Sequence, residues 1–182
     1  MPSRLDYALC YAALGWPVFP CDGKRPDGAL APQGFKNATR EPDRLRAWWA
    51  ERPEANLGVP CGEVSGFWVL DVDPRNGGNE ELQGLFPDGA PAEFATLLQT
   101  TGGGGRHFLF RHDARVRKGK LGRGLDVKRD GGYIVVEPSE TQSRYAFVDW
   151  DPFTGELPPV ADAPAWLIAL VAAPVAPAIN RC

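Results

Sequence analysis

The chain has 182 residues, 43% hydrophobic and 24% charged, which is enough for one domain, or one domain of two lobes, with a real core, and excludes a disordered or fibrous protein. No apolar run approaches the roughly 20 residues that cross a bilayer and no signal peptide is evident, so we expect a cytoplasmic protein with no membrane partner. The net charge of −3 argues against a protein that coats nucleic acid through bulk attraction.

The chain begins with a predicted helix over residues 4–14, whose apolar residues recur at three- and four-residue steps. Residues 16–20 follow as a short strand. Residues 21–37 are rich in Gly, Pro, Lys and Asp without periodicity, which predicts a long loop. Long loops in compact domains are often functional, so Lys24 and Lys36 are candidates to reach a ligand.

A second helix is predicted over residues 41–52. Its paired tryptophans, Trp48 and Trp49, could form a platform for base stacking, but their helical spacing from Leu45 favours a place in the core. The segment Asn56–Pro60 follows as another strand.

Residues 67–73 begin with four bulky apolar residues between two turns, a pattern typical of a buried strand. Alternate residues of a strand share a face, which places the Cβ atoms of Asp71 and Asp73 about 6 to 7 Å apart. Both carboxylates could then hold one divalent cation or a pair of them. The alternative is that both aspartates only cap the strand and begin the turn at Pro74.

A helix over residues 79–86 precedes two strands, over 96–101 and 106–110, which four glycines join. The bare backbone of residues 102–105 would let a phosphate approach main-chain N–H groups, whereas the alternative is a turn without a ligand. The segment lacks a Gly-Lys-Ser/Thr sequence, which excludes a P-loop.

The second of these strands has two distinct faces. His107 and Leu109 point one way, and Phe108 and Phe110 share the other face with Arg106. A histidine on an apolar face is usually a hydrogen-bonded core residue. The position of His107, two residues after the last of the four glycines, offers the alternative of a phosphate or metal contact.

Positive charge is concentrated in residues 111–129, where eight basic and two acidic side chains give a local charge of about +6. The basic residues are Arg111, Arg115, Arg117, Lys118, Lys120, Arg123, Lys128 and Arg129. Such a patch suits a polyanion held at one place, and the alternative is a solvated hairpin.

The basic segment runs into a strand that carries Asp126 and Lys128 on one face, between Leu125 and Val127. A partly buried aspartate needs a cationic partner. Lys128 could be that partner, or Asp126 could be a third ligand of the site at Asp71. A Gly-Gly turn and a return strand, Tyr133–Val136, follow.

A last strand is predicted over residues 144–148 and a closing helix over 163–171, which defines a domain over residues 1–171. Residues 172–182 are rich in Ala and Pro and are interpreted as a linker or a chain end. Four cysteines are widely spread and expected to be free thiols, with a zinc shared by Cys10, Cys21 and Cys61 as the alternative.

Several of these motifs together resemble the primase-polymerase domain of plasmid and phage replication proteins, in the archaeo-eukaryotic primase superfamily. The motifs are Asp71-Val-Asp73, Gly-Gly-Arg-His107, Asp126-Val-Lys, Asp-Gly-Gly-Tyr and Pro-Ser139. The framework Gly34-Phe-Lys-Asn-Ala-Thr39, Trp48-Trp49, Asn56-Leu-Gly-Val-Pro and Gly62 extends the resemblance to roughly residues 6–149. Any one motif is weak, but their order and intervals are specific.

The resemblance implies an α/β (α+β) fold of two lobes, with an RRM-like catalytic sheet flanked by helices. It implies that Asp71, Asp73 and Asp126 are catalytic and bind two divalent ions, Mg²⁺ or Mn²⁺. It also implies that His107 contacts the triphosphate of the incoming nucleotide, together with the backbone at Gly105. Arg106 and Lys128 are weaker candidates for nucleotide binding.

The sequence departs from the family pattern at Glu137, where the family usually has a second proline before Pro138-Ser139. A carboxylate near a triphosphate would be unfavourable, so we expect Glu137 to point away from it. The role of Ser139 stays open.

The expected function is a template-directed nucleotidyltransferase that makes and extends primers on single-stranded DNA from NTPs or dNTPs. The basic segment would hold template or primer phosphates, and the resemblance implies a helicase domain after Cys182 in the same polypeptide. The alternatives are a metal-dependent nuclease and a non-catalytic DNA-binding module of a replication initiator or helicase. A sugar-nucleotide transferase fits the Asp-x-Asp triplet but explains neither His107 nor Asp126.

Overall fold

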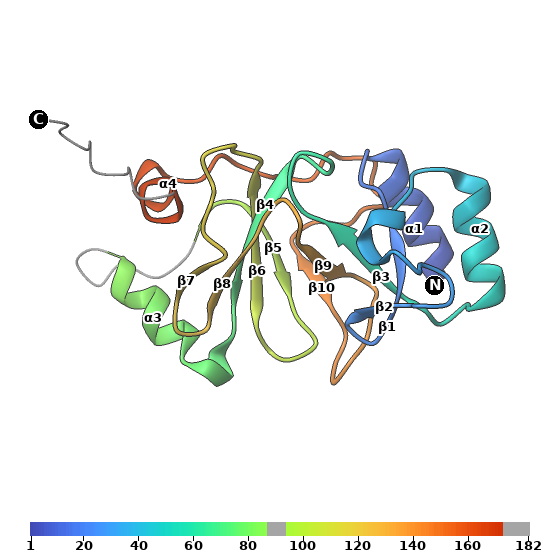
Figure 1. The fold of residues 1–182 in the computed structure, drawn as a ribbon, viewed down its shortest axis with the longest axis horizontal. Helices are drawn as coiled ribbons and strands as arrows, with labels where there is room; N and C mark the ends of the chain where they lie inside the picture. Colours follow the sequence, from blue (N-terminus) through green and yellow to red (C-terminus); the bar gives the residue numbers. More distant parts are fainter. Residues whose placement is uncertain (87–93, 173–182) are drawn as a thin grey trace, which may run out of the picture.

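Two antiparallel sheets lie between two pairs of helices in the computed structural model, which describes residues 1–86 and 94–172 (Figure 1). Helices α1 and α2 flank the smaller sheet, and α3 and α4 flank the larger one. The bounds of the helices are α1 Arg4–Ala13, α2 Pro42–Glu51, α3 Gly78–Leu85 and α4 Ala165–Val171. The predicted mixed α/β fold is therefore confirmed. Of the tail predicted over residues 172–182, all but Ala172 lies outside the described residues, and the domain bounds 1–171 stay a prediction.

The smaller sheet has the strand order β2-β1-β3-β9. Its strands are β1 Phe19–Asp22, β2 Arg25–Pro26, β3 Asn56–Pro60 and β9 Tyr133–Val136. The larger sheet has six strands in the order β10-β5-β6-β4-β8-β7. These are β4 Phe67–Val72, β5 Leu97–Thr100, β6 Arg106–Arg111, β7 Lys120–Gly122, β8 Leu125–Lys128 and β10 Ala146–Val148. The hairpin predicted at the four glycines is confirmed as β5–β6.

Two separate cores cover the two faces of the six-stranded sheet. On β4, Val69 faces a core that it shares with Tyr11 of α1 and Leu57 of β3, so this core also joins the two sheets. The neighbouring side chains of Trp68 and Leu70 face the other way, into a core closed by α3 and α4. Strand alternation thus divides the sheet into a face toward the smaller sheet and a face covered by helices.

The two N-terminal helices form for the reasons visible in their sequences. Ser3 and Asp6 cap each other at the start of α1, and Gly15 follows its end with a φ of 92°. Trp48 and Trp49 of α2 are buried, which confirms their place in the core.

None of the helices in the described part of the chain is long and apolar enough to cross a membrane.

Two predictions about strands were wrong. The strand expected over 16–20 begins only at Phe19 and runs to Asp22, because its bounds are set by pairing with β3 rather than by local apolarity. The expected loop over 21–37 therefore contains the end of β1, all of β2 and a 3₁₀ turn, Gly34–Asn37. Tyr133–Val136 does not return along the Asp126 strand but pairs with β3 in the other sheet. The chain thus crosses between the sheets just after β8.

Candidate active site

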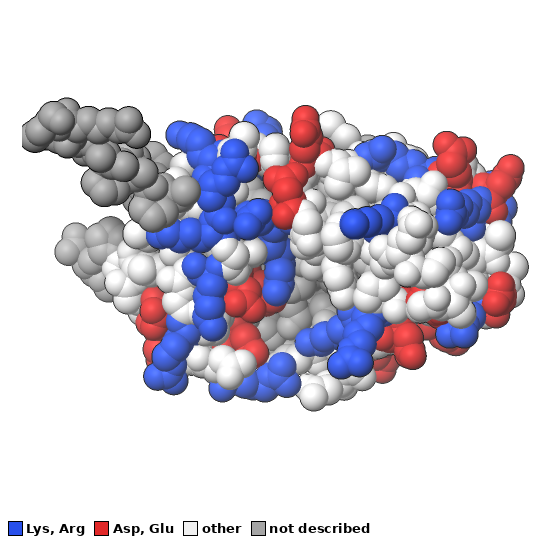
Figure 2. Space-filling view, viewed as in Figure 1, with Lys and Arg blue, Asp and Glu red and all other residues white. Residues whose placement is uncertain are grey.

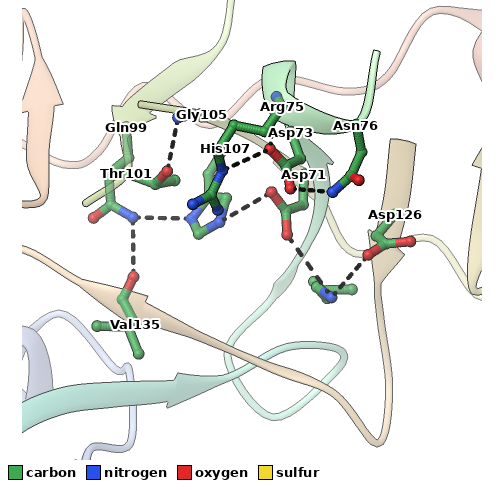
Figure 3. Close-up of polar contacts among 11 residues, drawn as sticks. Asp71, Asp73, Arg75, Asn76, Gln99, Thr101, Gly105, His107, Asp126 and Val135 are labelled. Carbon is green, nitrogen blue, oxygen red and sulfur yellow. Dashed lines mark hydrogen bonds and ion pairs between the residues drawn. The ribbon is translucent and has the colours of Figure 1, made fainter. Parts of the chain in front are cut away.

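A row of polar side chains crosses the six-stranded sheet on the face turned toward the smaller sheet (Figure 3). Asp71 of β4 is the direct partner of Asp126 on β8 and of His107 on β6. His107 is in turn the direct partner of Gln99 on β5. Residues opposite each other in antiparallel strands have Cβ atoms about 4.5 to 5.5 Å apart. Backbone register therefore brings four polar side chains together from four strands. We call these four residues the polar row: Gln99, His107, Asp71 and Asp126.

Asp71 lies at the centre of the polar row, where the apolar face of β4 ends. Its carboxylate is 3.5 Å from Nε2 of His107 and 3.8 Å from Nζ of Lys128. Burial alone would raise the pKa of Asp71, but the contact with His107 and the charges of Lys128 and Lys24 outweigh it and lower the pKa. Asp71 is therefore a partly buried carboxylate that stays ionised at neutral pH.

Asp126 and Asp71 share one cationic partner. Nζ of Lys128 lies 3.6 Å from Oδ2 of Asp126 and 3.8 Å from Oδ2 of Asp71. Lys128 was one of two cation partners that the sequence allowed for Asp126. The ammonium bridges the two carboxylates and offsets their mutual repulsion.

Asp73 follows the end of β4, and its side chain is used in the next turn. Its carboxylate accepts hydrogen bonds from the backbone N–H of Arg75 (3.0 Å) and from Nδ2 of Asn76 (2.7 Å). Burial raises the pKa of Asp73, but these hydrogen bonds outweigh it and lower the pKa. Asp73 still lines the same small cavity as Asp71 and Asp126. The three aspartates are thus neighbours, with the third turned toward its own loop.

The glycine turn between β5 and β6 lies beside the carboxylates. The N–H of Gly105 donates to Oγ1 of Thr101 (3.0 Å), and the N–H of Gly104 donates to the Thr101 carbonyl (2.9 Å). A Cβ on Gly105 would come within 2.6 Å of the Val72 carbonyl oxygen. Glycine is therefore required at 105 for the close approach of β6 to β4. The Gly105 N–H, which the sequence made a candidate for phosphate, is occupied by Thr101.

Arg106 and His107 are neighbours with opposite surroundings. Arg106 donates from Nη2 to Oδ1 of Asn79 on α3 (3.0 Å), and its guanidinium lies 5.2 Å from the centre of the Phe108 ring. Both contacts are on the helix-covered face. The structure therefore brings His107 into the polar row and leaves Arg106 outside it.

A cleft of about 410 Å³ opens between the two sheets in front of the polar row. We call each sheet with its flanking helices a lobe, and the walls of the cleft come from both lobes. Asp71, His107 and Lys128 line it from the lobe of the six-stranded sheet, and Lys24 and β9 line it from the lobe of the smaller sheet. A smaller cavity of about 90 Å³, lined by the three aspartates, adjoins it. Ligand sites usually have volumes of about 300 to 1,000 Å³, so the larger cleft could hold a small-molecule ligand.

Lys24 reaches the cleft from the turn between β1 and β2, and that turn is fixed on both sides of the lysine. Nδ2 of Asn56 donates to the Gly23 carbonyl (3.0 Å), and the hydroxyl of Tyr133 donates to the Lys24 carbonyl (3.1 Å). Within residues 1–86 and 94–172, no acidic side chain pairs with Lys24 within 4 Å. The second candidate of the same segment, Lys36, does not line the cleft.

Lysine and arginine side chains gather over β7 and β8, around a small group of acidic side chains (Figure 2). Two of the predicted basic residues are neutralised locally, since Arg115 pairs with Asp113 (2.6 Å) and Arg111 with Asp162 (3.7 Å). The residues of this segment without an acidic partner within 4 Å, among those described, are Arg117, Lys118, Lys120, Arg123 and Arg129. We call these five residues the basic surface. It is well placed to attract a polyanion toward the cleft.

A protein-family model described as "Bifunctional DNA primase/polymerase, N-terminal" (Prim-Pol) matches residues 8–166 of this chain. The chain belongs to this family. The match confirms the resemblance read from the sequence motifs and links the domain to DNA primases and polymerases generally. A search of curated proteins found no match.

Prim-Pol domains are expected to use divalent cations, and the donors at this site suit such ions. Asp71 and Asp126 offer oxygen ligands from neighbouring strands, and the Lys128 ammonium already marks a place between them that favours positive charge. The third carboxylate, Asp73, is engaged with Arg75 and Asn76. In keeping with this, no three His, Cys, Asp or Glu side chains among residues 1–86 and 94–172 are arranged as a ready metal cluster. The donor chemistry of Asp71 and Asp126 therefore suits a divalent cation, whereas the Asp73 carboxylate is turned toward its own loop.

Two residues around the motifs are structural. Glu137 accepts a hydrogen bond from the Phe147 N–H (2.9 Å) and lies near the Tyr7 hydroxyl (3.4 Å), so it points away from the cleft as predicted. Ser139 is fully buried, and its hydroxyl accepts a hydrogen bond from the Leu57 N–H (2.8 Å).

Cys10, Cys21 and Cys61 are free thiols.

Gln99 is a member of the polar row that was not predicted from the sequence. Its signal was a polar residue within an apolar strand segment that ends at the glycine turn. Because that turn forms a hairpin, residue 99 lies directly opposite His107. A hairpin register drawn from the turn would have placed the two side chains together.

Proposed function

We propose that this Prim-Pol domain is a template-directed nucleotidyltransferase that makes and extends primers on single-stranded DNA in plasmid or phage replication. The observation that carries the proposal is the polar row: an ionised Asp71 lies between His107 and Asp126 at the mouth of an interlobe cleft. Nucleotidyl transfer asks a protein mainly to position its substrates and to neutralise charge, and this row combines groups suited to both.

The incoming NTP or dNTP lies in the 410 Å³ cleft in this proposal. His107 donates a hydrogen bond to the phosphates from one lobe, and Lys24 approaches them from the other lobe. Lys128 moves from its bridging position toward the ligand or remains as a counter-charge to Asp71 and Asp126. Both lobes then contact one triphosphate. The turn that carries Lys24 is held in place by hydrogen bonds, which keeps this lysine in position for that contact.

Asp71 and Asp126, joined by Asp73 once it leaves Arg75 and Asn76, would hold Mg²⁺ or Mn²⁺. Two such ions, when bound, would activate the primer 3′-hydroxyl and neutralise the pyrophosphate leaving group. The chain itself keeps Asp71 ionised through its low pKa and holds it in register with Asp126. The carboxylates are therefore ready to accept cations at neutral pH.

Template and primer phosphates would run along the basic surface over β7 and β8. Its side chains meet phosphates rather than base edges, so binding would be salt-dependent and largely independent of sequence. A helicase domain after Cys182 in the same polypeptide stays a prediction from the resemblance, and a cytoplasmic location stays a prediction from the sequence composition.

The test is primer synthesis on single-stranded DNA with labelled NTPs and dNTPs and with Mg²⁺ or Mn²⁺. The chain is compared with its Asp71→Ala/Asp73→Ala variant, on unprimed templates and on templates with a supplied primer. We expect metal-dependent products and pyrophosphate release that disappear in the variant.

Other outcomes identify the competing functions. Release of nucleotides from DNA without use of triphosphates would indicate a metal-dependent nuclease. If neither protein makes product on either template while both bind DNA equally, the polymerase proposal fails and a DNA-binding module takes its place.

A further inference from the structure

Gln99 is the one member of the polar row whose side chain has no ionisable group, and it is completely buried. Its amide has three hydrogen-bonding partners. Nε2 lies 3.0 Å from Nδ1 of His107 and donates to the Val135 carbonyl (3.1 Å), and Oε1 accepts from the Glu137 N–H (2.9 Å). The side chain therefore ties β5 of the six-stranded sheet to the β9 region of the other lobe (Figure 3).

The orientation of the Gln99 amide is set by the two backbone groups alone. A backbone carbonyl can only accept and a backbone N–H can only donate, so NH₂ must face Val135 and the oxygen must face Glu137. The reversed amide would set two oxygens against each other at Val135 and two N–H groups at Glu137. This assignment makes no use of His107.

We propose that Gln99 is a positioning residue that fixes the tautomer of His107 with its proton on Nε2. The second N–H of the Gln99 amide points at Nδ1, which must then accept and carry no proton. The ring proton of the neutral imidazole is left on Nε2, the atom that faces Asp71 and the cleft. A donor, rather than a lone pair, is thereby presented to the cleft.

The inference rests on the proposed function in one respect: His107 acts there as a donor to the phosphates of the nucleotide. With the proton on Nδ1, the Nε2 lone pair would face the Asp71 carboxylate and any phosphate oxygen, which repels both. Because Gln99 takes its orientation from β9, the hydrogen-bonding state of the cleft histidine depends on the packing of the two lobes.

The direct test is the ¹⁵N–¹H long-range correlation spectrum of the imidazole rings, recorded without nucleotide or DNA. The chain has only two histidines, so a His112→Gln variant assigns both rings. We expect an unprotonated Nδ1 and a protonated Nε2 for His107. A proton on Nδ1 in the unaltered protein would overturn the inference without any variant.

Two substitutions then test the role of Gln99. Gln99→Glu keeps the volume and the acceptor for the Glu137 N–H but replaces the NH₂ group by an oxygen, so we expect the His107 proton to appear on Nδ1. Gln99→Met removes the donor, and we expect a mixture of tautomers. An unchanged Nε2–H pattern in the variants that fold would show that Gln99 does not set the tautomer.

A Ser139→Ala variant is the control for lost stability, because Ser139 bonds the Leu57 amide and makes no hydrogen bond to Gln99 or His107 among the described residues. We expect this variant to keep the protonated Nε2 and unprotonated Nδ1 of His107.

In primer extension, Gln99→Met should raise the KM for nucleotide about tenfold, because the hydrogen bond from His107 to the charged phosphates is weakened. Ser139→Ala should leave this KM unchanged. An equal rise in both would contradict the positioning role. Absence of polymerase activity in the unaltered chain would refute the proposed function and leave the tautomer result standing.

Discussion

The two faces of the six-stranded sheet carry different kinds of residues although they belong to the same strands. On β4, Leu70 lies in the core under α3 and α4, and the next residue, Asp71, lies in the polar row. On β6, Arg106 contacts Asn79 of α3 while His107 faces the cleft. A shift of one residue in any of these strands would exchange the two roles, so strand register is what defines the site.

The largest expected effect comes from removing a charge of the polar row. Asp126→Asn should lower nucleotide incorporation by about 10² to 10³-fold, as loss of a preorganised charge-stabilising group does in other enzymes. The measurement is single-nucleotide extension of a supplied primer under saturating substrates. Asp43→Asn is the matched control, because Asp43 is exposed on α2 and, among residues 1–86 and 94–172, forms an ion pair only with Arg46. Equal loss in both variants would contradict the assignment.

A substitution on the opposite face should affect stability and spare the chemistry. Leu70→Ala removes a fully buried side chain and should lower the free energy of unfolding by about 2 to 5 kcal/mol, measured by urea denaturation. At a temperature where the variant is folded, its incorporation rate should match that of the unaltered chain. A large loss of rate in the folded variant would mean that the two faces are not separable.

The contribution of the second lobe can be isolated at Lys24. Lys24→Met should raise the KM for nucleotide about tenfold with little change in kcat, because a charged hydrogen bond to the phosphates is lost. Lys36→Met is the control, since that lysine does not line the cleft. Steady-state extension kinetics at varied nucleotide concentration would show the difference. A fall in kcat alone would assign Lys24 a different role.

The smallest effect is expected at Arg106. Because its side chain contacts Asn79 and the Phe108 ring, Arg106→Gln should change the KM for nucleotide by less than about threefold, in the range of surface substitutions. His107→Asn in the same assay provides the contrast. A rise in KM for Arg106→Gln as large as for His107→Asn would restore Arg106 as a nucleotide ligand.

Much of this site could be predicted from the sequence because its signals are local. Alternation along β4 and β6 identifies which side chains share a face, and the four glycines identify the β5–β6 hairpin. The face of His107 and the burial of Trp48 and Trp49 follow from the same patterns.

The remaining features depend on contacts between distant segments. Nothing local shows that β8 pairs beside β4, which puts Asp126 opposite Asp71. Tyr133–Val136 pairs in the other sheet although it follows the Asp126 strand closely, and that crossing brings Lys24 to the cleft. The spacing of Asp71 and Asp73 predicts a common face, but the turn at Arg75 and Asn76 captures the second carboxylate.

The most direct test of the account is where a divalent cation binds. Mn²⁺ broadens NMR signals of nearby nuclei, and the two histidines report on two places: His107 in the polar row and His112 beside Asp130. Titration with Mn²⁺ should broaden the His107 ring signals first, and Asp126→Asn should abolish this broadening. Equal broadening of both rings, or broadening of His107 that persists in Asp126→Asn, would contradict the claim that the polar row is the metal-dependent reaction centre.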